Sequence, residues 1–334
     1  MSVFSNELAV DLGTTTTVVH VHKKGVVVRE PSAVATSRAG VVAVGSDAEE
    51  MSGRTPRGTE VVYPVRNRVV TDFDLTAALL RGLMSSPAIG RRPFRPRVAL
   101  PVSVTLSSVE MRAARESARV AGAREVHLLP QSIAAALGAG LPAFEAAGNM
   151  IIDVGGGGTE VSIISLGEVA VIESGRTGGE ALDLAISHYL RTYYGLQIGT
   201  RTAAQIKCRV GAAHVSGPPE VITVKGQDVV RGTPAAIEVK SDEVIAALEE
   251  PLDAIVDVVR TAFVNTPAEL SGDLFDRGVV LVGGGAQMPG LDVRIRERTG
   301  LPVFVADAGS DAVVLGAARA FEIPGALAKL ELSS

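Results

Sequence analysis

Two periods of hydrophobicity run along the chain, and the shorter one predicts strands. Short alternating or fully apolar stretches of this kind occur at residues 8–10, 18–22, 26–29, 32–35, 41–44, 98–101, 126–129, 149–154, 159–164, 279–282 and 303–306. We expect 26–29 and 32–35 to pair as a hairpin. The polar, Gly- and Arg-rich segment 46–68 predicts a loop or a small accessory lobe, and 219–240 predicts a further β-rich stretch.

The longer period, close to that of an α-helix, fills most of the segments between these strands. It predicts helices at residues 72–84, 107–119, 133–139, 181–193, 203–210, 242–263, 291–298 and 312–321. Ser107 and Glu110 form a capping-box pattern at one start. Pro251 lies inside the longest helix and predicts a kink or a break there. Strands that alternate with helices predict an α/β fold class, with helices on both faces of the sheets.

One pattern occurs twice. LAVDLGTTTT at 8–17 and MIIDVGGGGT at 150–159 each have a strand, an Asp, an apolar residue, a Gly and a turn of small residues before a second strand. The two aspartates, Asp11 and Asp153, are 142 residues apart. This spacing predicts two related domains, each with one such hairpin.

Composition narrows the function classes. The 334 residues are 46% hydrophobic, which excludes a disordered chain, and the net charge of −5 argues against a nucleic-acid partner. One cysteine, Cys208, excludes an intrachain disulfide and a cysteine-based zinc cluster, and we expect its side chain to be buried or to neighbour a nucleotide. No run of about 18 apolar residues predicts a membrane span, and the start of the chain lacks a signal-peptide pattern, so we expect a cytoplasmic protein.

The mean hydropathy of +0.29 is high for a chain with only 4% aromatic residues. Closely packed Ala-rich helices on buried sheets would explain it. Apolar surface that is buried only in an assembly or on a membrane would explain it as well. Composition leaves both explanations open.

The repeated turns have the chemistry of a phosphate site. Glycines leave backbone N–H groups free and let phosphate oxygens approach, and the hydroxyls of Thr14, Thr15 and Thr16 add donors. Two such turns that face each other would hold the β- and γ-phosphates of a nucleotide. Asp11 and Asp153 would then hold Mg²⁺ through its waters.

These residues resemble the actin-like ATPase superfamily, most closely the MreB/Mbl rod-shape-determining bacterial actins. DLGTTTT at 11–17 resembles the first phosphate loop and DVGGGGTEVSIISLG at 153–167 the second. Further matching segments lie at 44–56, 64–73, 96–129, 132–142, 178–183, 201–207 and 281–292. The resemblance implies an actin-like fold, with two related domains around a central nucleotide cleft.

The resemblance also implies domain limits. The first domain would comprise 1–140 plus 315–334, with a small subdomain at about 33–66. The second domain would comprise 141–314, with a small subdomain at about 181–240.

The implied activity is ATP-dependent polymerisation into membrane-associated filaments that organise cell-wall synthesis, with ATP and Mg²⁺ as cofactors. The implied ligands of the phosphates are Gly13, Thr14, Thr15, Thr16, Gly155, Gly156, Gly157 and Gly158. Asp11 and Asp153 would organise Mg²⁺ and water, and Lys207 would lie beside the base and sugar. The implied neighbours of adenine are Gly283, Gly284, Gly285 and Ala286.

Three positions depart from the family pattern. Gln131 stands where the family has the Glu that positions the attacking water, although eukaryotic actin also has a glutamine there. Gly158 replaces a Thr near the γ-phosphate, and the acidic residue expected just after Lys207 is absent, with Cys208 and Arg209 in that stretch. Because a neutral amide orients water but is a poor base, we expect nucleotide binding with slow or altered hydrolysis.

The loop before the strand at 98–101 is the expected membrane contact. It carries Arg91, Arg92, Phe94 and Arg95, which suit an anionic lipid surface at the inner face of the cell membrane. A solvated basic loop is the alternative. The alternatives for the whole chain are a degenerate paralogue that acts as a scaffold, a small-molecule kinase of the same superfamily, which lacks a suitable acceptor-side Asp here, and a chaperone ATPase domain.

Overall fold

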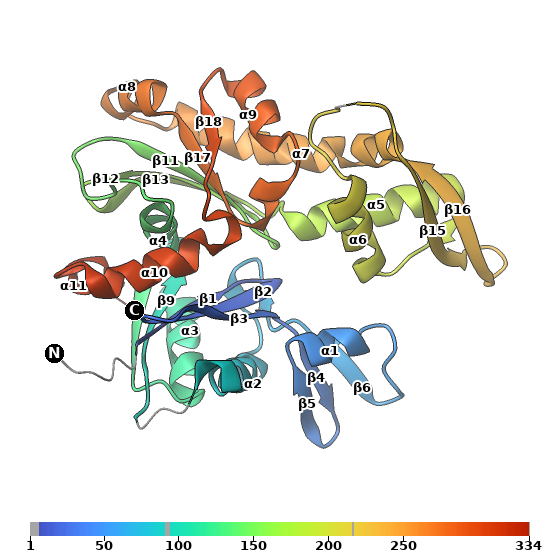
Figure 1. Ribbon diagram of the computed structural model, residues 1–334, viewed down its shortest axis with the longest axis horizontal. Coiled ribbons are helices and arrows are strands. Elements are labelled where there is room, and N and C mark those ends of the chain that lie inside the picture. The colour runs from blue at the N-terminus through green and yellow to red at the C-terminus, as the bar shows by residue number, and fades with distance from the viewer. Residues whose placement is uncertain (1–6, 91–93, 216, 334) are drawn as a thin grey trace.

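The computed structural model describes residues 7–90, 94–215 and 217–333, and two five-stranded sheets dominate it (Figure 1). The first sheet has the order β10-β9-β1-β2-β3. Its strands are β1 (Glu7–Leu12), β2 (Thr16–Val21), β3 (Gly25–Pro31), β9 (Arg97–Val102) and β10 (Glu125–Pro130). The second sheet has the order β13-β12-β11-β17-β18. Its strands are β11 (Asn149–Val154), β12 (Thr159–Ser165), β13 (Glu168–Gly175), β17 (Val279–Val282) and β18 (Val303–Val305).

The two sheets have the same pattern of pairing, which confirms the internal repeat. In the first sheet, β1 pairs antiparallel with β2 and parallel with β9. In the second sheet, β11 pairs antiparallel with β12 and parallel with β17. Each sheet is therefore an antiparallel meander of three strands extended by two parallel strands.

Two helices, α4 (Gln131–Gly138) and α10 (Ala312–Glu322), lie between the sheets (Figure 1). They pack so closely that a Cβ on Gly138 would lie 1.7 Å from the Ala312 carbonyl oxygen. Alanines line the rest of this layer, together with Val18 of the first sheet and Ile151 of the second. Close packing of Ala-rich helices therefore explains much of the hydropathy without aromatic residues, as the first of the two explanations predicted.

The outer faces of the sheets are covered by longer helices. On the first sheet these are α2 (Phe73–Met84) and α3 (Ser108–Val120), the latter with the predicted Ser107–Glu110 capping box. On the second sheet they are α7 (Ser241–Val264) and α9 (Leu291–Thr299), and α5 (Gly179–Tyr194) packs against α7. The remaining helical segments are α6 (Thr200–Val210), α8 (Ala268–Arg277), α11 (Ala326–Leu330), and the short 3₁₀ turns η1 (Pro87–Ile89), η2 (Gly284–Gln287) and η3 (Gly309–Asp311).

Each half of the chain also carries a small sheet, and both small sheets lie on the same side of the molecule (Figure 1). The first comprises β4 (Val34–Ser37), β5 (Gly40–Val44) and β6 (Thr59–Val62), with α1 (Ser46–Met51) against it. The second comprises β14 (Leu196–Gln197), β15 (Val221–Asp228) and β16 (Pro234–Lys240). A two-stranded hairpin, β7 (Val65–Arg66) and β8 (Val69–Val70), follows the first. The predicted domain limits stay predictions.

Several local predictions were wrong. The stretches at 26–29 and 32–35 do not form a hairpin, because β3 pairs with β2 in the large sheet and β4 pairs with β5 and β6 in the small one. Ser32, which lies between β3 and β4, is bound instead to the first glycine turn: its Oγ donates a hydrogen bond to the Gly13 carbonyl oxygen at 2.6 Å. By contrast, residues 46–68 were predicted to form a loop or a small accessory lobe, and the lobe is confirmed, because α1 and β6 belong to it.

The longest helix does not break at its proline. α7 continues for 24 residues across Pro251, although proline removes one helical hydrogen bond. Leu248, Leu252 and Ile255 are completely buried around it, so tertiary packing outweighs the local cost. Among the described residues, no helix is both long and apolar enough to cross a membrane.

Candidate functional site

The two repeated turns have the same local structure. In the first, the Gly13 N–H donates to the Thr16 carbonyl oxygen at 3.2 Å, and in the second the Gly155 N–H donates to the Gly158 carbonyl oxygen at 2.9 Å. A Cβ on Gly13 would lie 2.5 Å from that carbonyl oxygen of Thr16, so the first turn needs a glycine at its start. The matched motifs of the sequence therefore fold into matched hairpin turns.

The two turns contact each other. A Cβ on Gly156 would lie 2.4 Å from Thr15 Cγ2, and a Cβ on Gly157 would lie 2.5 Å from Thr14 Oγ1. The threonine side chains of one turn thus occupy the space that the glycines of the other leave open. We call residues 13–16 and 155–158, with the hairpin residues 67–68 beside them, the turn junction. The structure brings the predicted phosphate ligands together there, with the turns closed on one another.

Two carboxylates and an amide meet behind the turns. Asp11 lies on β1 and Asp153 on β11, and Gln131 Nε2 donates to Asp153 Oδ2 at 2.7 Å. Burial, and then the neighbouring charge of Asp153, raise the pKa of Asp11 to about 7. A hydrated divalent cation would offset this repulsion, and Mg²⁺ prefers oxygen ligands and keeps several waters. The predicted pair Asp11 and Asp153 therefore fits a magnesium ion held through water.

A residue that the sequence analysis missed, Arg68, occupies the centre of this group. Its Nη2 lies 3.3 Å from Asp153 Oδ2, and it donates to the Asp153 carbonyl oxygen at 3.1 Å and to that of Gly158 at 3.3 Å. Its Nη1 lies 3.1 Å from Glu160 Oε2. Burial opposes the charged form of Arg68, but the carboxylates of Asp153 and Glu160 outweigh it and raise the pKa of the guanidinium.

Glu160 is a second missed residue. It follows Thr159, which forms the strand pair next to the second glycine turn, and it is only 2% exposed. Its Oε2 accepts a hydrogen bond from Ser103 Oγ at 2.6 Å. Its position in the sequence, directly after GGGGT, was the one available signal. No local motif marked Arg68, because its partners lie 85 to 90 residues further along the chain.

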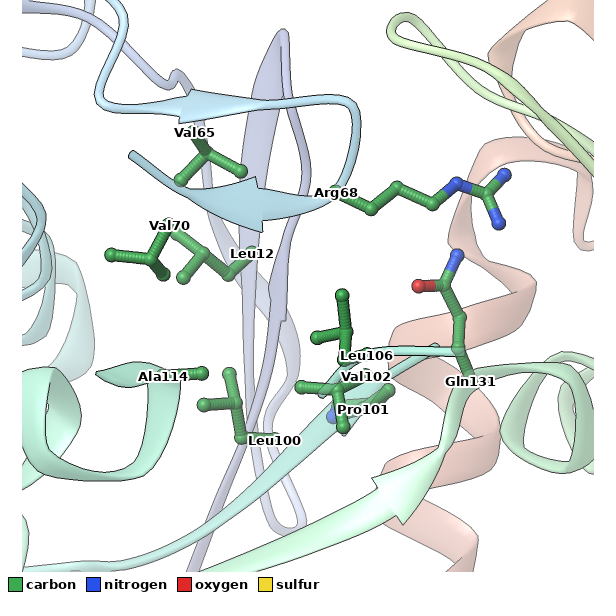
Figure 2. Close-up of a pocket in the computed structure, with 10 residues that line it drawn as sticks. All are labelled: Leu12, Val65, Arg68, Val70, Leu100, Pro101, Val102, Leu106, Ala114 and Gln131. Carbon is green, nitrogen blue, oxygen red and sulfur yellow. The ribbon is translucent and has the colours of Figure 1, made fainter. Parts of the chain in front are cut away.

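Figure 2 shows the side chains of Arg68 and Gln131 pointing toward one another at the polar end of a small pocket. The rest of its lining is apolar and comes from Leu12, Val65, Val70, Leu100, Pro101, Val102, Leu106 and Ala114. The pocket holds about 20 Å³, which suits one water molecule and is far too small for a nucleotide. It therefore lies beside the turn junction, with which it shares Arg68, and is not itself a ligand pocket.

The start of α5 joins Lys207 to the second turn. The Gly179 N–H donates to the Gly155 carbonyl oxygen at 3.0 Å, and Lys207 Nζ donates to the Gly179 carbonyl oxygen at 2.8 Å. Lys207 Nζ also lies 2.8 Å from Asp183 Oδ1. Burial raises the pKa of Asp183, and Lys207 opposes that rise. An acidic residue of α5 thus lies beside Lys207, although the one expected just after Lys207 in the sequence is absent.

Cys208 was wrongly expected to be buried. It is exposed, because α6 buries Ala203, Ile206 and Val210, and Cys208 lies out of phase with that face.

The third glycine cluster lies against the end of β11. A Cβ on Gly283 would lie 2.5 Å from Asp153 Oδ1, and a Cβ on Gly285 would lie 2.3 Å from Val154 Cγ1. Gly284 is exposed and Ala286 is buried. Gly283 to Ala286 therefore border the turn junction, as a role beside the nucleotide requires.

The expected membrane loop lies away from this site. Phe94 and Arg95 are exposed, with 67% exposure at Phe94, and they precede the amino end of β9, whereas Val102 at its other end lines the pocket of the junction. Arg91 and Arg92 lie outside the described residues. Within the described ranges, no group of three or more His, Cys, Asp or Glu side chains is arranged to hold a metal on its own.

The chain is similar to a known protein family and to several proteins of known sequence. A family model described as MreB/Mbl protein matches residues 5–329. The cell shape-determining protein MreB of Escherichia coli strain K12 is 43% identical over 328 residues, with coverage of 96% of this chain and 94% of that protein. The cell shape-determining protein Mbl of Bacillus subtilis strain 168 is 36% identical over 332 residues, with coverage of 99% and 100%.

Solved structures agree. MreB5 of Spiroplasma citri bound to AMPPNP is 30% identical with a TM-score of 0.89, and the match covers 95% of this chain and 96% of that one. The double helical filament of MamK has a TM-score of 0.79 at 19% identity, over 95% and 99% of the two chains, and shows a shared fold. The predicted actin-like fold and the resemblance are confirmed, and the chain belongs to the MreB/Mbl family.

Proposed function

We propose that this chain binds ATP and Mg²⁺ at the turn junction and polymerises with it into membrane-associated filaments that contribute to cell shape and cell-wall synthesis. The observation that carries the proposal is the meeting of both glycine turns with Asp11, Asp153 and Gln131 at one place. The relatives support it: MreB of E. coli and Mbl of B. subtilis are cell shape-determining proteins, and MreB5 of S. citri has been solved with AMPPNP and with ADP.

Different residues at the turn junction bind different parts of the nucleotide and its metal ion. The turns at 13–16 and 155–158 separate to admit the phosphates, which then accept hydrogen bonds from backbone N–H groups and threonine hydroxyls. Asp11 and Asp153 would hold Mg²⁺ through its waters; when bound, that ion neutralises phosphate charge. Lys207 and Asp183 lie on the side of the second turn where α5 begins, and we assign them to the sugar and base side, with Gly283 to Ala286 opposite.

Hydrolysis depends on Gln131. Its Nε2 is anchored to Asp153 Oδ2, so the amide has a fixed orientation behind the turns and can position a water molecule. It cannot take a proton as a carboxylate would, and Gly158 adds no hydroxyl, so we expect slow ATP hydrolysis. Steady-state phosphate release under polymerising conditions tests this. A rate equal to that of an MreB relative with an acidic residue at this position would contradict it.

Sedimentation tests the polymer. We expect the protein to pellet with ATP and Mg²⁺, less with ADP, and not without nucleotide. Absence of a pellet in every condition would remove the filament, and a pellet without nucleotide would remove the ATP switch.

The loop with Phe94 and Arg95 supports a membrane contact. One exposed aromatic ring among arginines suits an anionic surface, where each basic residue contributes about 1 kcal/mol. We place the filament at the inner face of the cell membrane, with membrane proteins of cell-wall synthesis as partners. Co-sedimentation with vesicles that contain phosphatidylglycerol should fall in Phe94→Ala and Arg95→Ala. Equal binding to neutral vesicles would identify the loop as solvated surface.

One alternative has structural support. The closed contact of the turns and the amide at Gln131 favour a scaffold paralogue that polymerises with little or no nucleotide turnover. Nucleotide-independent pelleting, together with undetectable phosphate release, would establish it.

A further inference from the structure

Arg68 has a backbone conformation that does not suit an arginine. The β7–β8 hairpin has a two-residue loop, Asn67 and Arg68, whose φ angles are +49° and +67°. Both values lie in the left-handed region, where the second loop position strongly favours glycine. Strain of this kind at a non-glycine residue persists where the surroundings hold the residue in place.

The side chain of Arg68 accounts for this strain. The hairpin belongs to the part of the chain with the first sheet, yet the guanidinium contacts Asp153, Gly158 and Glu160 in the part with the second sheet. The Arg68 N–H meanwhile donates to Thr14 Oγ1 at 3.2 Å, which ties its backbone to the first turn. Arg68 therefore contacts both glycine turns and adds to the contacts between the two sheets.

The charges at this place favour a cation that can change partners. Asp11, Asp153 and Glu160 surround one guanidinium, so the entry of a polyphosphate adds negative charge to a site that already has an excess of it. A guanidinium binds phosphate oxygens with the same forked geometry as carboxylates. Arg68 Nη2 lies 3.3 Å from the carbonyl oxygen of Gly158, so the guanidinium is already beside one of the two turns proposed to hold the phosphates.

We propose that Arg68 is a phosphate ligand of the nucleotide site, which pairs with Asp153 and Glu160 when no nucleotide is bound and with the terminal phosphate of ATP when it is. This inference rests on the proposed function. It adds a built-in cation that takes over part of the charge neutralisation otherwise supplied by Mg²⁺. The consequence is that ATP binds measurably even without the metal.

Calorimetric titration with ATP and with ADP, each in Mg²⁺ or in EDTA, tests the proposal. Arg68→Gly removes the side chain and suits the positive φ, and Arg68→Lys keeps the charge without the fork. Arg66→Gln removes a positive charge from the exposed side of the same hairpin and serves as the matched control. We expect Arg68→Gly to lose about tenfold or more in ATP affinity in EDTA, and Arg68→Lys and Arg66→Gln to lose less than about threefold.

Two comparisons within the same titrations add to this. The loss in Arg68→Gly should be smaller for ADP, which lacks the terminal phosphate, and smaller with Mg²⁺, which supplies the missing charge. Equal or tighter ATP binding by Arg68→Gly in EDTA would overturn the proposal, as would wild-type protein that binds ATP only with Mg²⁺. Wild-type protein that binds no ATP even with Mg²⁺ would overturn the proposed function itself, and this inference with it.

Hydrogen exchange without nucleotide provides a readout that is independent of binding. Arg68→Gly should exchange faster at the amides of 155–160 than wild type, because the ion pairs that hold the second turn are gone. Unchanged exchange there, with a folded protein by circular dichroism, would show that Arg68 does not hold the empty site together.

Discussion

Among the contacts in the described residues that join the part of the chain with the first sheet to the part with the second, two differ in their chemistry. At one, α4 and α10 cross between the sheets, lined by alanine, with Gly138 and Gly316 at the closest approach. At the other, the turn junction, glycine meets threonine, and Arg68 reaches across to Asp153 and Glu160. The first contact is mainly apolar, and the second is polar and charged.

The difference indicates separate roles. The helix contact leaves no space for a methyl group at Gly138 or Gly316, and its main polar contact is internal, from Arg319 of α10 to the Leu137 carbonyl oxygen of α4, so we expect it to persist in every state of the molecule. The turn junction consists of backbone N–H groups, hydroxyls and charged side chains, which are the groups that the proposed function assigns to phosphate and magnesium. We expect it to open and close with the nucleotide, while the helix contact acts as the fixed support. Four substitutions test this division.

The largest effect should follow from a methyl group at the helix contact. A Cβ on Gly316 would lie 1.6 Å from the Ala134 carbonyl oxygen, a backbone atom that cannot rotate away. Gly316→Ala should therefore lower the free energy of unfolding by more than about 3 kcal/mol in urea titrations. The matched control is Gly272→Ala in α8, where a Cβ meets nothing within 4 Å and should raise stability by about 0.5–1 kcal/mol. Equal stability of the two variants would disprove the tight contact.

The second-largest effect should follow from the loss of a charge at the turn junction. Asp153→Asn removes one of the two ion pairs of the buried Arg68 and one of the two proposed magnesium-binding carboxylates. We expect a loss of about 2–3 kcal/mol in stability and of about 100-fold in affinity for ATP with Mg²⁺. Asp253→Asn, which also removes a carboxylate from a buried arginine, Arg294, should leave ATP affinity unchanged. An equal loss of ATP affinity in both variants would mean that the effect is on folding alone.

The pH dependence of stability should distinguish the two contacts more finely. The pKa of Asp11 is about 7 in the folded protein against an ordinary 3.8, so the folded state holds this proton more tightly than the unfolded chain does. Asp11 therefore favours folding at low pH, and its contribution is lost as the pH rises toward about 7. The slope is at most about 1.4 kcal/mol per pH unit.

Urea unfolding without nucleotide between about pH 5 and about pH 8 measures this slope. Asp11→Asn should flatten it, and Gly316→Ala should lower stability equally at each pH. A slope that is the same in wild type and Asp11→Asn would show that Asp11 is not the group that titrates.

The smallest effect should come from the contact between the turns. A methyl group on Gly156 would lie 2.4 Å from Thr15 Cγ2, but Thr15 is exposed and its side chain can rotate. We expect Gly156→Ala to cost about 1 kcal/mol, and Thr15→Gly combined with it to recover most of that loss. Additive losses in this double-mutant cycle would mean that the two side chains do not meet in solution.

Local sequence was sufficient where neighbours along the chain decide the structure. The hairpins at 11–17 and 153–159 were predicted because strand, glycine and strand follow in order, and so was the cap at Ser107. α8 was missed because it has few apolar residues, of which only Leu274 is completely buried, although these residues do share one face. β13 was also missed, since its half-buried residues alternate without a clear apolar face.

At Cys208 and Pro251, tertiary packing outweighs what the residue type alone predicts. Cys208 was expected inside because of its residue type, but the helical phase set by Ala203, Ile206 and Val210 leaves it exposed. Pro251 was expected to disturb its helix, but burial of the leucines on either side keeps α7 continuous.

The sequence by itself determined the fold class, the internal repeat and the two glycine turns, because each of these depends on residues close together in the chain. Only the tertiary structure decided what completes the site. Arg68 reaches Asp153 and Glu160 because the hairpin of the first half packs beside the turn of the second, and Asp183 rather than a neighbour in sequence pairs with Lys207. These charged side chains are tens of residues apart in the sequence and meet because both sheets pack on α4 and α10. The sequence motifs therefore do not predict these contacts.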